Sequence, residues 1–280
     1  MSDARTSILL LYSLYLAACT PMAAVGMLGS TLIKTAEHAS ENSDSTVTQY
    51  PVVSQDYNRK EIAVANLNLG IAYMQQGHYQ LALEKMTRAK IAKPDFAPTY
   101  NALGLLYQRI GEMEMAEESF KYSLKLSPDD SGTLNNYGLL LCQNERYEEA
   151  DKVFNESASN PLYSTPEIAI SNAGTCALKN GKPEIAENYF KQALNKNPAV
   201  GPALIQMAEI LYDRGDYLSS RDYLHRYLAI NDHTPKTLWL GIRIERELGD
   251  KDALASYELL LRNKFSDSKE AQLLEESRIN

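Results

Sequence analysis

Four glycines recur at an almost constant spacing along the middle of the chain. Gly70, Gly104 and Gly138 lie 34 residues apart, and Gly174 follows 36 residues later, with the two extra residues in the segment Asn160-Pro161-Leu162-Tyr163. A period of this length indicates that one supersecondary unit is repeated and that neighbouring units stack to share a continuous core. The period therefore constrains the fold more strongly than any other feature of the sequence.

Other residue types keep the same register. Three positions after the glycines stand Tyr73, Tyr107, Leu141 and Ala177, and twelve positions after them stand Ala82, Ala116, Ala150 and Ala186. Sixteen positions after the glycines stand the large apolar residues Met86, Phe120, Phe154 and Phe190. A proline closes three of the units, at Pro94, Pro128 and Pro198. This pattern resembles the tetratricopeptide repeat. The resemblance implies two antiparallel helices, A and B, in each unit and an all-α, right-handed superhelical solenoid of about six units.

Small residues have a physical role in such a unit. The glycine and the alanine allow the backbones of helices A and B to approach where they cross, and the aromatic residue fills the space beside them. A second set of glycines, Gly77, Gly111, Gly181 and Gly215, is expected to end the A helices in a left-handed conformation. A fifth unit covers about residues 201–234 and a degenerate sixth about residues 235–267, and a terminal helix over 269–277 would shield the last apolar face.

The N-terminus is typical of a secreted lipoprotein. Residues 1–5 carry a small positive balance, and residues 8–18 are uncharged and largely apolar, ending at Leu16-Ala17-Ala18-Cys19. This tetrapeptide resembles a bacterial lipobox, so we expect a signal peptide over 1–18 and lipidation of Cys19. Residues 19–58 would then contain the lipidated Cys19 and a flexible tether, because the segment from Lys34 to Asn58 is polar and aperiodic, and the repeat domain would occupy 59–280.

Two other interpretations of this region remain open. Residues 8–28 are uncharged and could form an uncleaved membrane anchor, or Cys19 could be a buried structural cysteine. The residue after Cys19 is Thr20 and not Asp. By resemblance to lipoprotein sorting in bacteria with two membranes, the protein would then be anchored in the outer membrane and face the periplasm.

Charge and motif content argue against several functions. The chain carries 28 Lys and Arg against 36 Asp and Glu, a net charge of −8 that disfavours nucleic acid as a partner. Its four histidines lack metal-ligand spacing, and no nucleotide-binding or hydrolase motif is present. The acidic runs at 112–118 and 145–149 are expected to be a solvated face. The sequence therefore predicts a protein that is not an enzyme, with no catalytic residues, metal, cofactor or small-molecule substrate.

The A helices of a tetratricopeptide stack line a concave groove that can bind a partner. The positions that would face this groove include recurring asparagines, which could bond the backbone of an extended peptide, and several leucines and an isoleucine, which could form an apolar floor. The alternative is that these amides hydrogen-bond neighbouring helices. The predicted groove residues are Leu67, Asn68, Ile71, Asn101, Leu105, Asn135, Asn136, Leu139 and Asn172.

Cys142 and Cys176 lie on the A helices of adjacent units. Parallel neighbouring helices could bring their Cα atoms within the ~4.4 to 6.8 Å that a disulfide requires. We therefore expect a disulfide in the periplasm, with two buried free thiols as the alternative.

Several stretches resemble the type IV pilus biogenesis lipoprotein family, PilF or PilW, over nearly the whole mature chain. These stretches are Leu134-Asn135-Asn136-Tyr137-Gly138, Arg146-Tyr147-Glu148-Glu149-Ala150, Asn160-Pro161-Leu162-Tyr163, Asn172-Ala173-Gly174-Thr175-Cys176-Ala177, Met207-Ala208-Glu209 and Leu240-Gly241-Ile242-Arg243. The resemblance implies a pilotin, an outer-membrane lipoprotein that promotes localisation and multimerisation of the secretin through protein–protein binding. A generic periplasmic scaffold of another envelope complex is the alternative function.

Overall fold

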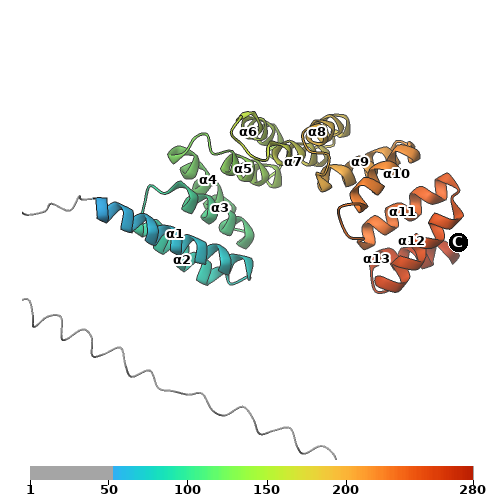
Figure 1. The fold of residues 1–280 in the computed structure, drawn as a ribbon, viewed down its shortest axis with the longest axis horizontal. Coiled ribbons are helices and arrows are strands. Elements are labelled where there is room, and N and C mark those ends of the chain that lie inside the picture. Colours follow the sequence, from blue (N-terminus) through green and yellow to red (C-terminus); the bar gives the residue numbers. More distant parts are fainter. Residues whose placement is uncertain (1–52, 280) are drawn as a thin grey trace, which may run out of the picture. The chain divides into compact units, whose positions relative to one another are not determined.

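The computed structural model describes residues 53–279, which form helices that follow one another in pairs, joined by short turns. Each pair consists of an A helix with an odd number and a B helix with an even number, and a single helix, α13, follows the sixth pair (Figure 1). The helices are α1 (Val53–Gln75), α2 (Tyr79–Ala92), α3 (Ala97–Ile110), α4 (Met113–Leu126), α5 (Ser131–Gln143), α6 (Tyr147–Ser159), α7 (Pro166–Lys179), α8 (Pro183–Lys196), α9 (Gly201–Asp213), α10 (Tyr217–Leu228), α11 (Pro235–Leu248), α12 (Lys251–Lys264) and α13 (Lys269–Ile279).

The pairs stack in chain order. Within each pair the two helices pack against each other, and each A helix also contacts the A helix of the next unit, from α1 and α3 to α9 and α11. The predicted all-α repeat solenoid is thereby confirmed. The A helices of successive units lie side by side, so residues about 34 positions apart can meet across a junction.

The consensus glycines are buried where the two helices of a unit cross. A Cβ atom added to Gly104, Gly138 or Gly174 would come within 2.6 to 2.7 Å of the ring of Phe120, Phe154 or Phe190, respectively. These rings are fully buried and lie against the glycines. The predicted packing of glycine and aromatic residue is therefore confirmed, and it explains why the glycine carries no side chain.

The turns between helices A and B are left-handed, as predicted. Gly77, Gly111, Gly181 and Gly215 have φ angles between 70° and 87°. In the third unit the corresponding residue is Glu145, with φ of 61°. The turn is retained there without glycine, since the amide of Arg146 donates to the carbonyl of Leu141 at 2.9 Å as its counterparts do elsewhere.

A terminal helix covers the apolar face at the C-terminal end of the repeats, as expected. The degenerate sixth unit forms the pair α11 and α12, and α13 packs against both. Ala271 and Leu274 of α13 are buried with Leu238, Ile242 and Leu261. The terminal helix thus shields the last apolar face, as predicted.

The first described helix begins before the predicted start of the repeat domain. We expected the repeat domain to begin at residue 59, whereas α1 begins at Val53. The predicted signal peptide, Cys19 and most of the predicted tether lie outside the described residues.

Candidate protein-binding surface

Asparagines on three consecutive A helices form two cross-helix pairs. The side-chain amide of Asn136 on α5 donates to the side-chain oxygen of Asn101 on α3 at 3.0 Å, and Asn172 on α7 donates to Asn135 on α5 at 2.9 Å. Gln108 on α3 likewise donates to Gln143 on α5 at 2.9 Å. We call these three bonds the amide ladder; their presence supports the interpretation in which the asparagines tie neighbouring helices together.

The amide ladder does not use all the hydrogen-bonding groups of its members. Each amide has two N–H donors and a carbonyl oxygen with two lone pairs, and each bond of the ladder uses one donor and one acceptor. Asn101, Asn136 and Asn172 are half-buried, and Asn135 is buried. The half-buried amides can therefore bond both a neighbouring helix and a polar group of a bound chain.

The predicted apolar floor is only partly accessible. Leu67 is buried in the core of the first unit with 6% of its surface exposed, so its prediction as a groove residue is wrong. The cause is its position on α1, where it packs against the second unit's core residues. Ile71 and Leu105 are half-buried against that core, whereas Leu139 and Asn68 are exposed.

Cys142 on α5 and Cys176 on α7 face each other across the junction of the third and fourth units. Their Cα atoms are 5.8 Å apart, and their sulfurs are paired. This separation lies within the range that a disulfide requires. Both residues are buried, so the structure permits the predicted bridge and places it inside the core.

One acidic residue of the predicted solvated runs has a structural role. Glu117 on α4 accepts hydrogen bonds from Arg146 on α6 and from the hydroxyl of Tyr137 on α5, and it forms an ion pair with Lys121. Partial burial opposes its ionised form, but the bonds from Arg146, Lys121 and Tyr137 outweigh that and lower the pKa of Glu117 to about 2. Glu117 therefore joins two units, and its assignment to a purely solvated face is wrong.

Neither a metal-binding cluster nor a membrane-spanning helix occurs among the described residues. No group of three or more His, Cys, Asp and Glu side chains there could hold a metal ion. None of the described helices is long and apolar enough to cross a membrane.

Comparison with known proteins identifies the repeats and their relatives. Models of the tetratricopeptide repeat match residues 97–130 and 172–235. The type IV pilus assembly protein PilF of Pseudomonas aeruginosa is 30% identical over 217 residues, which cover 78% of this chain and 86% of that protein.

Solved structures agree with the sequence comparison. The structure of Pseudomonas aeruginosa PilF matches 79% of this chain and 99% of its own at 30% identity, with a TM-score of 0.71. The structure of PilW, a type IV pilus biogenesis factor, matches 76% of this chain and 98% of its own at 29% identity, with a TM-score of 0.68. With the repeat architecture already established, these matches show that the chain belongs to the PilF and PilW family of tetratricopeptide-repeat proteins of type IV pilus biogenesis.

Proposed function

We propose that this protein is an outer-membrane lipoprotein adaptor, a pilotin, that binds the secretin of a type IV pilus system and promotes its localisation and multimerisation. The observation that carries the proposal is family membership together with a repeat surface whose half-buried amides keep free hydrogen-bonding capacity. The protein acts by binding and needs no cofactor or small-molecule substrate. Its partners are the secretin and, through the lipid on Cys19, the membrane.

Anchoring is tested at Cys19. Replacing it with Ala removes the thiol that would take the lipid, so the protein should leave the outer-membrane fraction and secretin multimers there should become scarce. One acyl chain alone binds a membrane only marginally, so a protein without any acyl chain should not remain attached to the membrane. Fractionation and immunoblotting of lipoprotein and secretin measure both effects. Recovery of the Cys19→Ala protein in the outer membrane at the normal level would refute lipid anchoring at this residue.

The amide ladder is tested with a variant that removes both partners of one bond. The double variant Asn101→Ala and Asn136→Ala removes both side-chain amides, so no amide is left without its hydrogen-bond partner. The free energy of unfolding should therefore fall by less than about 1 kcal/mol. The hydrogen bonds that these amides make to the secretin should be lost, each contributing about 0.5 to 1.5 kcal/mol, and affinity should fall roughly tenfold. Thermal melting and binding to purified secretin are measured on the same protein.

A matched control comes from two exposed asparagines on α8. Asn188→Ala together with Asn195→Ala makes the same chemical change on a B helix and should leave secretin binding unchanged. If the Asn101 and Asn136 variant melts normally and still supports full secretin binding, the secretin binds to another surface. If the unaltered protein does not bind secretin at all, the adaptor function itself is wrong and a scaffold in another envelope complex becomes the better interpretation.

A further inference from the structure

Leu162, in the connection between α6 and α7, is 90% exposed, more than any other large apolar side chain of the described residues. Single apolar residues are common on protein surfaces, so exposure alone does not indicate a binding role. Leu162 differs from the other exposed apolar residues in its position within the repeat and in the turn that holds it.

The other units have a polar or small residue at the position of Leu162. In each of the first four units a proline stands two positions after the last residue of the B helix, and the residue after that proline is exposed. This exposed residue is charged or small in the first, second and fourth units and large and apolar in the third. In chain order, the four residues are Asp95, Asp129, Leu162 and Ala199.

Leu162 has no role in the core of the repeats. The residue after it, Tyr163, is half-buried. The residues at the same place in two other connections also face inwards: Phe96 packs against the core of the first two units, and Val200 is buried. Tyr163 therefore takes the inward position of this connection, and the packing of the helices does not require a leucine at 162.

A hydrogen-bonded turn fixes the backbone around Leu162. The side-chain oxygen of Asn160 accepts a hydrogen bond from the amide of Leu162 at 2.9 Å, and its carbonyl oxygen accepts one from the amide of Tyr163 at 3.1 Å. Pro161 restricts φ at the second position of this turn. The side chain of Asn160 also donates to the carbonyl of Asp129 at 3.1 Å, which ties the turn to the preceding connection. Little backbone order is then lost when Leu162 is bound.

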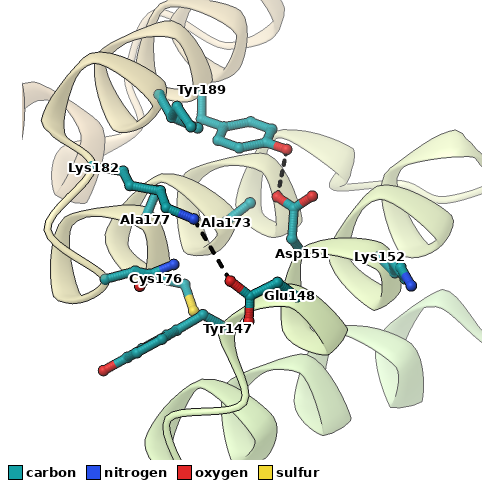
Figure 2. A pocket seen from close by; sticks show the side chains of 11 residues that line it. Tyr147, Glu148, Asp151, Lys152, Ala173, Cys176, Ala177, Lys182 and Tyr189 are labelled. Atoms are coloured by element: carbon teal, nitrogen blue, oxygen red, sulfur yellow. Dashed lines mark hydrogen bonds and ion pairs between the residues drawn. The ribbon is translucent and has the colours of Figure 1, made fainter.

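The helices at the two ends of the connection are held together as well. The sulfurs of Cys142 on α5 and Cys176 on α7 are paired. The hydroxyl of Tyr189 on α8 donates to a carboxylate oxygen of Asp151 on α6 at 2.6 Å (Figure 2). The turn thus presents Leu162 from a base in which α5, α6, α7 and α8 are linked by side-chain contacts.

The edge of the stack around this turn is acidic. The B helices α4, α6 and α8 end here and the A helices α5 and α7 begin here. The last turn of α6 has no basic residue, and two lysines lie in the last turns of α4 and α8. The four acidic residues are Asp129, Asp130, Glu156 and Glu167, against Lys125 and Lys196. This excess repels anionic lipid headgroups and favours a protein surface with basic side chains.

We propose that Leu162 inserts into an apolar socket on the partner protein and that lysine or arginine side chains line the rim of that socket. The proposal rests on the proposed function, because the partner is taken to be the secretin. The walls of the socket cover Leu162, and its basic rim lies over Asp129 and Glu156. The contact uses none of the residues of the amide ladder, so the two surfaces can be tested independently.

Leu162→Ala tests the contact in the full-length mature lipoprotein. It gives the third unit the residue that Ala199 provides in the fourth, so the melting temperature should not change. Binding to purified secretin, measured by titration in detergent, should weaken at least tenfold, whereas Leu162→Met keeps a large apolar side chain and should bind within threefold of normal. Leu218→Ala is the matched control, since Leu218 is 65% exposed in the first turn of α10. It should bind secretin as the unaltered protein does.

The basic rim is tested with salt and with charge-neutral variants. Binding of the unaltered protein should weaken as sodium chloride is raised, because the charges are screened. Asp129→Asn together with Glu156→Gln should lose most of this salt dependence. Salt-independent binding by the unaltered protein would overturn the basic rim.

The remaining outcomes separate this contact from the proposed function. Secretin binding within twofold of normal by a folded Leu162→Ala protein overturns the socket and leaves the adaptor function standing. If Leu162→Ala binds secretin normally but loses flotation with lipid vesicles or self-association, the occupant is a membrane or a second copy and the proposal is wrong. Failure of the unaltered protein to bind secretin removes the proposed function itself.

Discussion

Replacing both Cys142 and Cys176 with alanine is expected to lower the free energy of unfolding by about 3 to 4 kcal/mol. The two residues are 34 positions apart, so the bond closes a long loop and restricts the unfolded chain accordingly. The bond also crosses the junction where the sequence has its two-residue insertion, between the end of α6 at Ser159 and the start of α7 at Pro166. A covalent link between α5 and α7 therefore stabilises a junction whose connection is longer than those that follow α2, α4 and α8.

Chemical unfolding with and without reductant measures this contribution. Reductant should destabilise the unaltered protein by the same amount and should have no effect on the alanine variant, which serves as the control. Alanine is preferred to serine because both positions are buried and a hydroxyl there would need a partner. If both thiols of protein taken from cells are alkylated without reductant, the disulfide is absent and this expectation fails.

Most of the fold was predictable from spacing alone. The positions of Gly104, Phe120 and Gly111 determine where the helices cross and where they turn, and these depend on backbone geometry that every unit shares. Even the degenerate sixth unit was recognisable, because its Leu248-Gly249-Asp250 turn retains the left-handed glycine. Such features follow from local sequence and a fixed period, so one unit predicts the next.

The surface was less predictable because it depends on pairs of side chains from different units. Asn101 and Asn136 are 35 residues apart, a separation that places two residues side by side on neighbouring A helices. This separation could have identified the amide ladder, but the choice between a bond to a helix and a bond to a ligand depends on rotamers.

The ion pair between Arg221 on α10 and Glu245 on α11 was not predicted at all. It joins the fifth unit to the degenerate sixth, and the Glu245 side chain is almost completely buried, with 1% exposed. Arg221 also approaches Asp250 at 3.5 Å. Both residues occur where the repeat pattern is weakest, so the consensus offers no information about them.

Replacing Arg221 with methionine should cost about 3 to 5 kcal/mol, because it leaves the Glu245 carboxylate buried without its cation. Methionine keeps much of the length and apolar stem of arginine, so the loss of stability measures the missing charge more than missing packing contacts. Arg226→Met is the control on the same helix; Arg226 is exposed beside the ring of Tyr223, and its loss should change stability by less than about 0.5 kcal/mol. Urea unfolding of the two variants gives both values.

A double variant separates the ion pair from the packing around it. If Arg221→Met is combined with Glu245→Met, no buried charge remains, and most of the stability lost in Arg221→Met should return. The coupling energy of the cycle then measures the interaction itself, since each single variant removes one partner. Because the pair joins α10 to α11, the single variant should first unfold the sixth unit and α13, and hydrogen exchange should rise there before it rises in α3 to α8. An Arg221→Met protein no less stable than Arg226→Met would mean that Glu245 does not depend on this cation, and that the sixth unit is held by the apolar contacts of α11 and α13 alone.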